Sequence, residues 1–349
     1  MVARPGGLWS VVAVLAVALA TLAALSVRGG GPPVEVRLAL DVSPVPLDGA
    51  DPSRSMAGPL HYLGGLWLRS PDARFGGLSD LRVSADGARL FAASDCGYGF
   101  TASLSYDGAG RLVGLTDARI IDLAGVDGRP LPVGGSDAES LVLGAEGLEV
   151  GFEGRGKVLA YGTGTEPAFA GPARRLPTPA GHPTCGWNKG LEVMADTGDG
   201  RRLLICEGRR GASGTAPAWV GTGDDWTARE YPLLFGGGWA REPFRPTGAT
   251  RLPDGDVVVL ERRFPPMGAR LVRLSRANLD GEGPLEPREV ARLDAPLPVD
   301  NFEGVEARTD ASGRTLVYLL SDDNNCSKSW TFRRPGPQRT LLLLFALPG

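Results

Sequence analysis

The sequence predicts an all-β protein, a β-propeller of about six blades, with seven as the alternative. Three observations predict it: a unit of two paired strands that recurs, a period on the order of 50 residues, and many turn residues. Gly contributes 51 and Pro 29 of the 349 residues, as expected where turns separate many short strands. A period in this range with four short strands per unit is typical of propeller blades.

The clearest copy of the unit spans residues 300–324. An alternating strand leads through a turn at Ser312-Gly313 into the apolar run from Leu316 to Leu320, which has the length and β-propensity of a buried strand. Because a hairpin folds back on itself, Glu303 before the first strand and Asp322 after the second should return to the same edge of the sheet.

Four earlier copies of the unit precede this one. The five copies, including the last, start at residues 79, 139, 189, 247 and 303. The intervals between these starting points are 60, 50, 58 and 56 residues. The strand-like residues 34–74 and the apolar tail 338–347 do not match the repeat. Together they supply close to one repeat length, so we expect the N- and C-terminal segments to share a blade that closes the ring.

The N-terminus carries a segment that is not part of the propeller. Residues Leu8 to Val27 contain no charge, which is typical of a secretory signal or of a single membrane anchor. Ala18-Leu19-Ala20 suits cleavage, whereas the long apolar run favours retention, and both alternatives remain open. We therefore expect residues 1–33 to be a signal peptide or anchor followed by a Gly/Pro spacer. Residues 34–349 form the propeller, which lies outside the cytoplasm, and membrane contact is made only through the N-terminal segment.

The charge balance and the scarcity of histidine exclude several functions. A formal net charge of −3 without a basic helix argues against nucleic acid as a partner. His61 and His182 are the only histidines, which argues against a His-based triad or a zinc site. Ser79 lacks the flanking glycines of a nucleophile elbow.

Acidic residues recur where the second strand of each unit ends. They are Asp95, Glu153, Glu207, Glu261, Asp322 and Asp323. In blades that radiate from one axis, these side chains would ring the mouth of a central funnel. Carboxylate oxygens are the ligands that calcium prefers, and the arginines that follow most of them suit a phosphate or carboxylate. The alternative is structural: each acid accepts hydrogen bonds from turn amides and pairs with its neighbouring arginine.

Several segments resemble one known family, in order along the chain. They are Phe75-Gly76-Gly77-Leu78-Ser79, Asn188-Lys189-Gly190-Leu191-Glu192, Arg245-Pro246-Thr247-Gly248, Leu260-Glu261-Arg262-Arg263-Phe264, Asp300-Asn301-Phe302-Glu303-Gly304 and Ser321-Asp322-Asp323-Asn324. From Arg74 to Leu347 the chain is similar to the phytase-like domain family, whose members are described as having esterase-like activity of phytase type. The resemblance implies an exported β-propeller distantly akin to calcium-dependent phytases. Asp80, Cys96 and Cys326 depart from the family pattern.

These observations predict a site with calcium as the cofactor and a small anionic molecule as substrate or ligand. The candidate catalytic residues are Glu303, Glu192, Asp322 and Glu261. The candidate metal ligands are Glu303, Asp322, Asp323 and Glu139. The candidate substrate-binding residues are Lys189, Arg209, Arg262 and Asn301. Two functions stay open: a calcium-dependent hydrolase of a small phosphoester or other anionic ester, and a non-catalytic propeller that binds a ligand or protein through the same face.

The four cysteines are expected to form disulfides, because the count is even and the chain is exported. Four cysteines allow three connectivities. Cys185 precedes one repeat start and Cys206 ends the same hairpin, so these two should meet at one edge. Cys96 and Cys326 both follow acidic residues that end a strand, which should place them on the same face of the ring. We predict the pairs Cys185–Cys206 and Cys96–Cys326.

Overall fold

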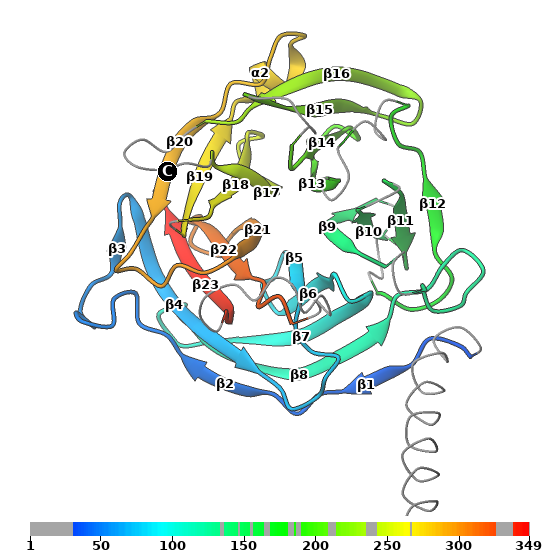
Figure 1. Ribbon diagram of the computed structural model, residues 1–349. Helices are drawn as coiled ribbons and strands as arrows, with labels where there is room; N and C mark the ends of the chain where they lie inside the picture. The colour runs from blue at the N-terminus through cyan, green and yellow to red at the C-terminus, as the bar shows by residue number, and fades with distance from the viewer. Residues whose placement is uncertain are drawn as a thin grey trace, which may run out of the picture.

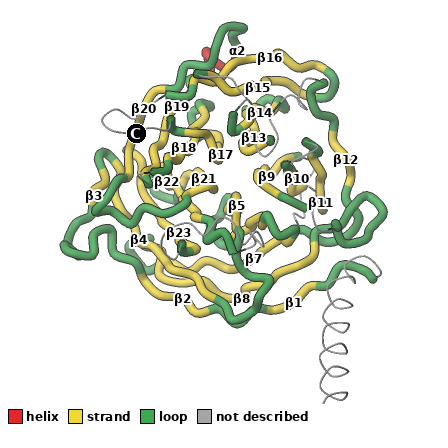
Figure 2. Tube along the Cα trace, in the orientation of Figure 1, coloured by secondary structure: helices red, strands yellow, loops and turns green. Residues whose placement is uncertain are grey.

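The computed structural model shows a ring of five β-sheets around one axis (Figure 1). It describes residues 31–132, 136–145, 147–153, 156–163, 168–180, 185, 190–208, 214–234, 243–265, 267–325 and 338–348. Strands make up almost all the regular structure of these residues, and the short helix α2 (Arg276–Asp280) lies at the outside of the ring (Figure 2). The fold is therefore an all-β propeller, as the sequence predicts.

The first four blades follow the chain from the axis outward. Blade 1 contains β5 (Leu78–Val83), β6 (Arg89–Ser94), β7 (Tyr98–Tyr106) and β8 (Leu112–Asp122), with β1 (Glu35–Arg37) on its outer edge. Blade 2 contains β9 (Ala138–Gly144), β10 (Gly147–Phe152), β11 (Val158–Tyr161) and β12 (Arg174–Leu176). Blade 3 contains β13 (Leu191–Asp196), β14 (Arg202–Cys206), β15 (Thr215–Thr222) and β16 (Asp225–Pro232). Blade 4 contains β17 (Arg245–Arg251), β18 (Val257–Arg263), β19 (Gly268–Leu274) and β20 (Arg288–Leu293).

Blade 5 joins the two ends of the chain. It contains β21 (Phe302–Thr309), β22 (Thr315–Ser321), β23 (Thr340–Leu347), β4 (Leu60–Arg69) and β2 (Asp41–Pro44), and β3 (Met56–Ala57) pairs with β4. The C-terminal strand β23 lies between β22 and the N-terminal strand β4, antiparallel to both. The terminal segments thus close the ring, as expected.

The number of blades differs from the prediction: the described residues form five, not six or seven. The prediction counted the terminal segments as a blade in addition to the five repeats. The fifth repeat, however, contributes only the hairpin β21–β22 before the tail, so β23 and β4 serve as the third and fourth strands of that same blade. A hairpin alone cannot bury both of its faces, and the terminal strands complete it.

The strand next to the axis is the first strand of each repeat, not the second. The innermost strands β5, β9, β13, β17 and β21 contact one another around the ring. The acids at the end of the second strand of each unit therefore lie one strand farther from the axis. Because the two strands are antiparallel, the start of the first and the end of the second still lie at the same end of the propeller.

Arg82, on the innermost strand β5, connects the blades across the axis and is buried. Its guanidinium donates hydrogen bonds to backbone carbonyl oxygens of four inner strands, those of Leu81, Val305, Met194 and Ala249. It also pairs with Asp80 at 3.2 Å and with Glu306 at 3.6 Å. Asp80 in turn accepts a hydrogen bond from the Leu141 amide of β9, so all five inner strands take part.

The predicted signal or anchor, Leu8 to Val27, lies outside the described residues. Within those residues, no helix has the length and apolar character needed to cross a membrane.

Candidate acidic metal site

A β-bulge recurs at one position of the inner strand in every blade. The register shifts between Leu78 and Asp80 in blade 1 and at the matching point of the other four blades. The extra residues are Ser79, Glu139, Glu192, Thr247 and Glu303. A bulge locally re-aims a side chain, and three of the five positions hold a glutamate. The repeated bulge thus brings carboxylates from different blades to the same end of the ring.

A second set of side chains follows the end of the second strand. In four blades the residue at this point is acidic and its amide donates a hydrogen bond to the residue two before the bulge. These residues are Asp95, Glu153, Glu207 and Asp322. In blade 4 the matching residue is Arg262, which pairs in register with Arg245, two before the bulge.

Glu261 is therefore not part of this set, and its catalytic role stays a prediction. It lies one residue before Arg262, and neighbouring side chains of a strand point to opposite faces. Its carboxylate pairs with Arg270 of β19 and accepts a hydrogen bond from the Tyr231 hydroxyl of blade 3 at 2.7 Å. Burial raises the pKa of Glu261, and Arg270 opposes that shift.

We use the name acidic cluster for nine carboxylates at this end of the propeller. They are Asp95, Asp137, Glu139, Glu153, Glu192, Glu207, Glu303, Asp322 and Asp323. Burial raises the pKa of four of them well above the usual range, and the charges of the others raise it further; these four are Asp95, Glu139, Glu192 and Asp322. Burial also raises the pKa of Glu153 to about 7. Like charges held out of water favour protonation or a bound cation.

Blade 2 supplies the tightest group of the acidic cluster. Asp137, Glu139 and Glu153 each offer a carboxylate oxygen, and these oxygens lie within 4.8 Å of one another. Among the described residues no cation is paired with any of the three. The sequence predicts Glu139 as a metal ligand but misses Asp137, whose place in Asp137-Ala138-Glu139 matches that of Asn301 two residues before Glu303.

Blade 5 holds the predicted ligands Glu303 and Asp322 close together. The buried Asn301 amide donates to Glu303 Oε1 at 2.8 Å and to Asp322 Oδ2 at 3.3 Å. Arg262 of blade 4 pairs with Glu303 at 3.2 Å and with Glu207 of blade 3 at 3.7 Å. Burial lowers the pKa of Arg262, but Glu303, Glu207 and further acids more than offset this, so its pKa is raised and it stays charged.

Two carboxylates of the acidic cluster, Asp323 and Asp95, lie where blade 5 meets blade 1. Asp323 Oδ1 accepts hydrogen bonds from the amides of Gly77 at 2.9 Å and Asn325 at 3.1 Å, which ties the loop before β5 to the end of β22. The Oδ1 atom of Asp95 is buried without a hydrogen-bond partner in the described part of the chain. A buried carboxylate oxygen without a partner destabilises the folded state unless a ligand binds to it.

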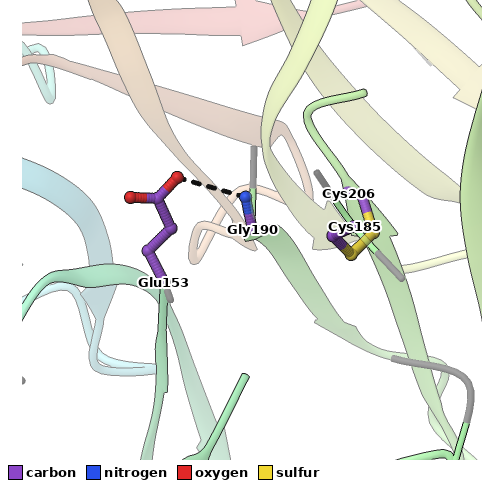
Figure 3. Close-up of a disulfide and its surroundings, with 4 residues drawn as sticks. All are labelled: Glu153, Cys185, Gly190 and Cys206. Atoms are coloured by element: carbon purple, nitrogen blue, oxygen red, sulfur yellow. Dashed lines mark hydrogen bonds between the residues drawn. A yellow bond between two sulfur atoms is a disulfide. The ribbon is translucent and has the colours of Figure 1, made fainter. Parts of the chain in front are cut away.

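The segment around the predicted Lys189 is only partly described. Glu153 accepts a hydrogen bond from the Gly190 amide at 3.1 Å, which connects blades 2 and 3 beside the disulfide (Figure 3). Lys189 and Arg209, both predicted to bind substrate, lie outside the described residues.

The predicted Cys185–Cys206 disulfide is present, with the two Cα atoms 5.8 Å apart (Figure 3). It connects the loop before β13 to the end of β14, so it fastens the hairpin at the same end as the acidic cluster. The predicted Cys96–Cys326 bond involves Cys326, which lies outside the described residues.

The acidic cluster fits a hard cation. Its donors are carboxylate oxygens, which calcium prefers, and the tightest group of three comes from blade 2. The unpartnered Asp95 oxygen and the raised pKa values both indicate that negative charge here is not fully compensated by the described residues.

Comparison with known proteins gives the family. A model of the family "Phytase-like: Esterase-like activity of phytase" matches residues 73–325. The chain belongs to the phytase-like family. No curated protein matches the chain.

Solved structures similar to this phytase-like chain show low identity. The PQQ-bound aldose sugar dehydrogenase of Streptomyces coelicolor is 14% identical over 90% of this chain and 100% of that one, with a TM-score of 0.40. A Dyadobacter fermentans protein of unknown function is 13% identical over 92% and 96%, with a TM-score of 0.43. The RRP9 WD40 repeats are 10% identical over 89% and 100%, with a TM-score of 0.40. None of these likenesses bears on the activity.

Proposed function

We propose that this phytase-like protein is a calcium-dependent hydrolase of a small phosphoester or other anionic ester, acting at the acidic cluster. One observation carries the proposal: Asp137, Glu139 and Glu153 converge within 4.8 Å without a paired cation among the described residues. A group of like charges is stable only with protons or a cation to offset them, and oxygen-only ligands select calcium over softer metals.

Two sets of carboxylates would hold calcium. The first is Asp137, Glu139 and Glu153 of blade 2; the second is Glu303 and Asp322 of blade 5, with Asp95 of blade 1 contributing its unpartnered oxygen. Bound calcium would polarise a substrate oxygen and offset the negative charge that develops during hydrolysis. Asp323, predicted as a ligand, has one oxygen engaged by two backbone amides and fits a supporting role better.

Other residues of the site would bind the substrate or orient the reacting groups. Arg262, held between Glu303 and Glu207, would face the anionic group of the substrate, together with the predicted Lys189 and Arg209. The bulged Glu192 and Glu303 would orient the attacking water. Asn301 is 1% exposed and bonds to two carboxylates, so it fits the orienting of Glu303 and Asp322 better than substrate contact.

The test is a calcium titration of hydrolysis against a panel of phosphoesters and carboxylic esters. We expect activity that chelation removes and calcium restores. Glu303→Gln keeps the size and hydrogen-bonding capacity of the side chain but loses its charge, so it should lower calcium affinity and activity at least tenfold. Glu230→Gln, which removes an exposed acid from β16, serves as the matched control and should behave as wild type.

Two outcomes would contradict the proposal. If Glu303→Gln keeps full, chelator-insensitive activity while Ser79→Ala is inactive, the protein is a serine esterase. If the wild type neither binds calcium nor hydrolyses any ester of the panel, it is a ligand-binding propeller.

We also propose that the protein acts outside the cytoplasm, in the periplasm or an equivalent compartment. The Cys185–Cys206 disulfide supports this, because disulfides persist mainly in oxidising compartments. Fractionation of the source cells with mass measurement of the mature chain tests it, and a cytoplasmic product that retains Met1 would overturn it.

A further inference from the structure

A groove of about 520 Å³ lies between blades 2 and 3, at the end of the propeller opposite to the acidic cluster. Leu143 and Asp196, which line it, lie near the far ends of β9 and β13, the strands whose second residues are Glu139 and Glu192 of the acidic cluster. A second cavity of about 230 Å³ at the axis shares Leu143, Asp196 and Arg251 with it. The groove falls in the size range of small-molecule sites, roughly 300–1,000 Å³.

Apolar side chains form the floor and one wall of this groove. Met194 and Leu204 are buried beneath it, and the half-buried Leu176 and Trp226 pack against the same hydrophobic cluster. The Trp226 indole donates a hydrogen bond to the Gly223 carbonyl at 2.8 Å, which holds the ring in place. A fixed aromatic side chain beside aliphatic ones suits a flat apolar group, which stacks or packs edge-on.

One guanidinium of the groove remains available to an anion. Arg202 is engaged by Glu149 at 2.7 and 2.8 Å and by Asp196 at 2.9 Å. Arg251 pairs with Asp196 through Nε, at 3.3 Å, and its side chain is 43% exposed. Its two terminal nitrogens donate no hydrogen bond to the part of the chain that the structure describes, although Glu306 of the neighbouring cavity lies near enough to interact with its charge. They can bind a carboxylate through two parallel hydrogen bonds.

The backbone of the groove makes room for both arginines. Gly198 has a φ of +86°, and a Cβ atom there would lie 2.9 Å from Arg251 Cδ. A Cβ atom on Gly144 would overlap the Glu149 carboxylate and lie 2.6 Å from Arg202 Nη2. Larger residues at these two positions would displace the charged side chains, so the sequence specifies where the charges of this groove lie.

We propose that the groove binds a small organic anion with a flat apolar ring, an aromatic carboxylate. The ring packs against Trp226 and Leu176, and the carboxylate pairs with Arg251. The site is separate from the acidic cluster and does not depend on calcium.

The test measures binding of 2-naphthoate to the purified protein by isothermal titration calorimetry, with neutral 2-naphthamide as the uncharged comparison. We expect one saturable site for naphthoate in the wild type and at least tenfold weaker binding of naphthamide. Arg251→Ala should weaken naphthoate binding at least tenfold and leave naphthamide unchanged, whereas Trp226→Ala should weaken both. Arg111→Ala, which removes an exposed arginine from a turn of blade 1, is the matched control and should bind as wild type.

The thermal midpoint of each variant shows whether it is folded, and Arg251, being partly exposed, can be replaced without leaving a buried cavity. Three results would overturn the proposal. The first is the absence of saturable naphthoate binding at millimolar concentration, and the second is equal naphthoate binding by folded Arg251→Ala. The third is loss of binding on addition of EDTA, which would show that naphthoate binds at the acidic cluster instead. Unchanged binding in EDTA would support it.

Discussion

Replacing Glu139 with Gln should stabilise the metal-free protein and weaken its response to calcium. Glu139 lies within 4.8 Å of carboxylate oxygens of Asp137 and Glu153. At this separation two unit charges repel by about 3.5 kcal/mol with an effective dielectric constant of about 20. Protons taken up by the cluster relieve part of the repulsion, so we expect Glu139→Gln to raise the free energy of unfolding in EDTA by about 1–3 kcal/mol at pH 7.5.

Calcium should act in the opposite direction in the wild type. At a free concentration 100 times its Kd, a ligand that binds only the folded state stabilises it by about 2.7 kcal/mol. A tenfold weaker Kd in the variant would reduce this gain to about 1.4 kcal/mol. With an unfolding entropy of about 0.7 kcal/mol/K for roughly 315 residues, these energies correspond to a Tm increase of about 4 °C in the wild type and about 2 °C in the variant.

The pH dependence follows from the direction of the pKa shifts. The carboxyl groups of the acidic cluster have raised pKa values in the folded state, about 7 for Glu153, so the folded protein holds more protons than the unfolded chain. Their contribution to stability is fully present below the unfolded pKa of about 4.5 and is lost as the pH rises toward 7 and above. In EDTA, the wild type should therefore be more stable near pH 5 than near pH 7.5, and Glu139→Gln should flatten this dependence.

Differential scanning fluorimetry in EDTA and in calcium, at both pH values, measures all of these effects, with Glu230→Gln as the control. The reasoning is refuted if Glu139→Gln lowers Tm in EDTA, since the glutamate would then be a stabilising partner and not a repelled charge. It is equally refuted if calcium leaves the Tm of the wild type unchanged.

Two further predictions concern the scaffold. Arg82→Met removes the cation that bonds to four inner strands and leaves Asp80 and Glu306 unpaired, so chemical denaturation should show a loss of about 3–5 kcal/mol; a loss below about 1 kcal/mol would show that the axis does not depend on this residue. Cys185→Ser opens a disulfide with a sequence separation of 21 and should cost about 3 kcal/mol in oxidising buffer. The difference from wild type should disappear in reducing buffer, and a difference that persists there would point to packing instead.

The sequence predicts the propeller because its signals are local. Hairpin turns and apolar runs repeat along the chain, and the pairing of Cys185 with Cys206 follows from one hairpin. The predicted number of blades is wrong because β4 and β23 pair across almost the whole sequence. Neither segment contains a signal that shows which hairpin it pairs with.

The position of Glu261 outside the acidic cluster has a similar origin. Register is a property of two strands, and the turn that joins them decides which residue of the second strand lies opposite the bulge of the first. Read along the chain, Glu261 ends its apolar run as the other acids do; only pairing with β17 shows that Arg262 is the matching residue. Asp137 is missed because it lies just before its strand and not at the end of an apolar run. Only the folded structure brings its carboxylate beside those of Glu139 and Glu153.

The pairing of β4 with β23 in blade 5 also bears on how the chain acquires its fold. Gly65 of β4 pairs with Leu343, so the apolar strand β4 lacks this neighbour until β23, more than 270 residues later, has been synthesised. Blades 1 to 4 can assemble as their hairpins emerge, but the ring cannot close before the last strand arrives. Closure of the ring must therefore wait for β23, and until then the unpaired edge of β4 is where a nascent chain would most need a chaperone.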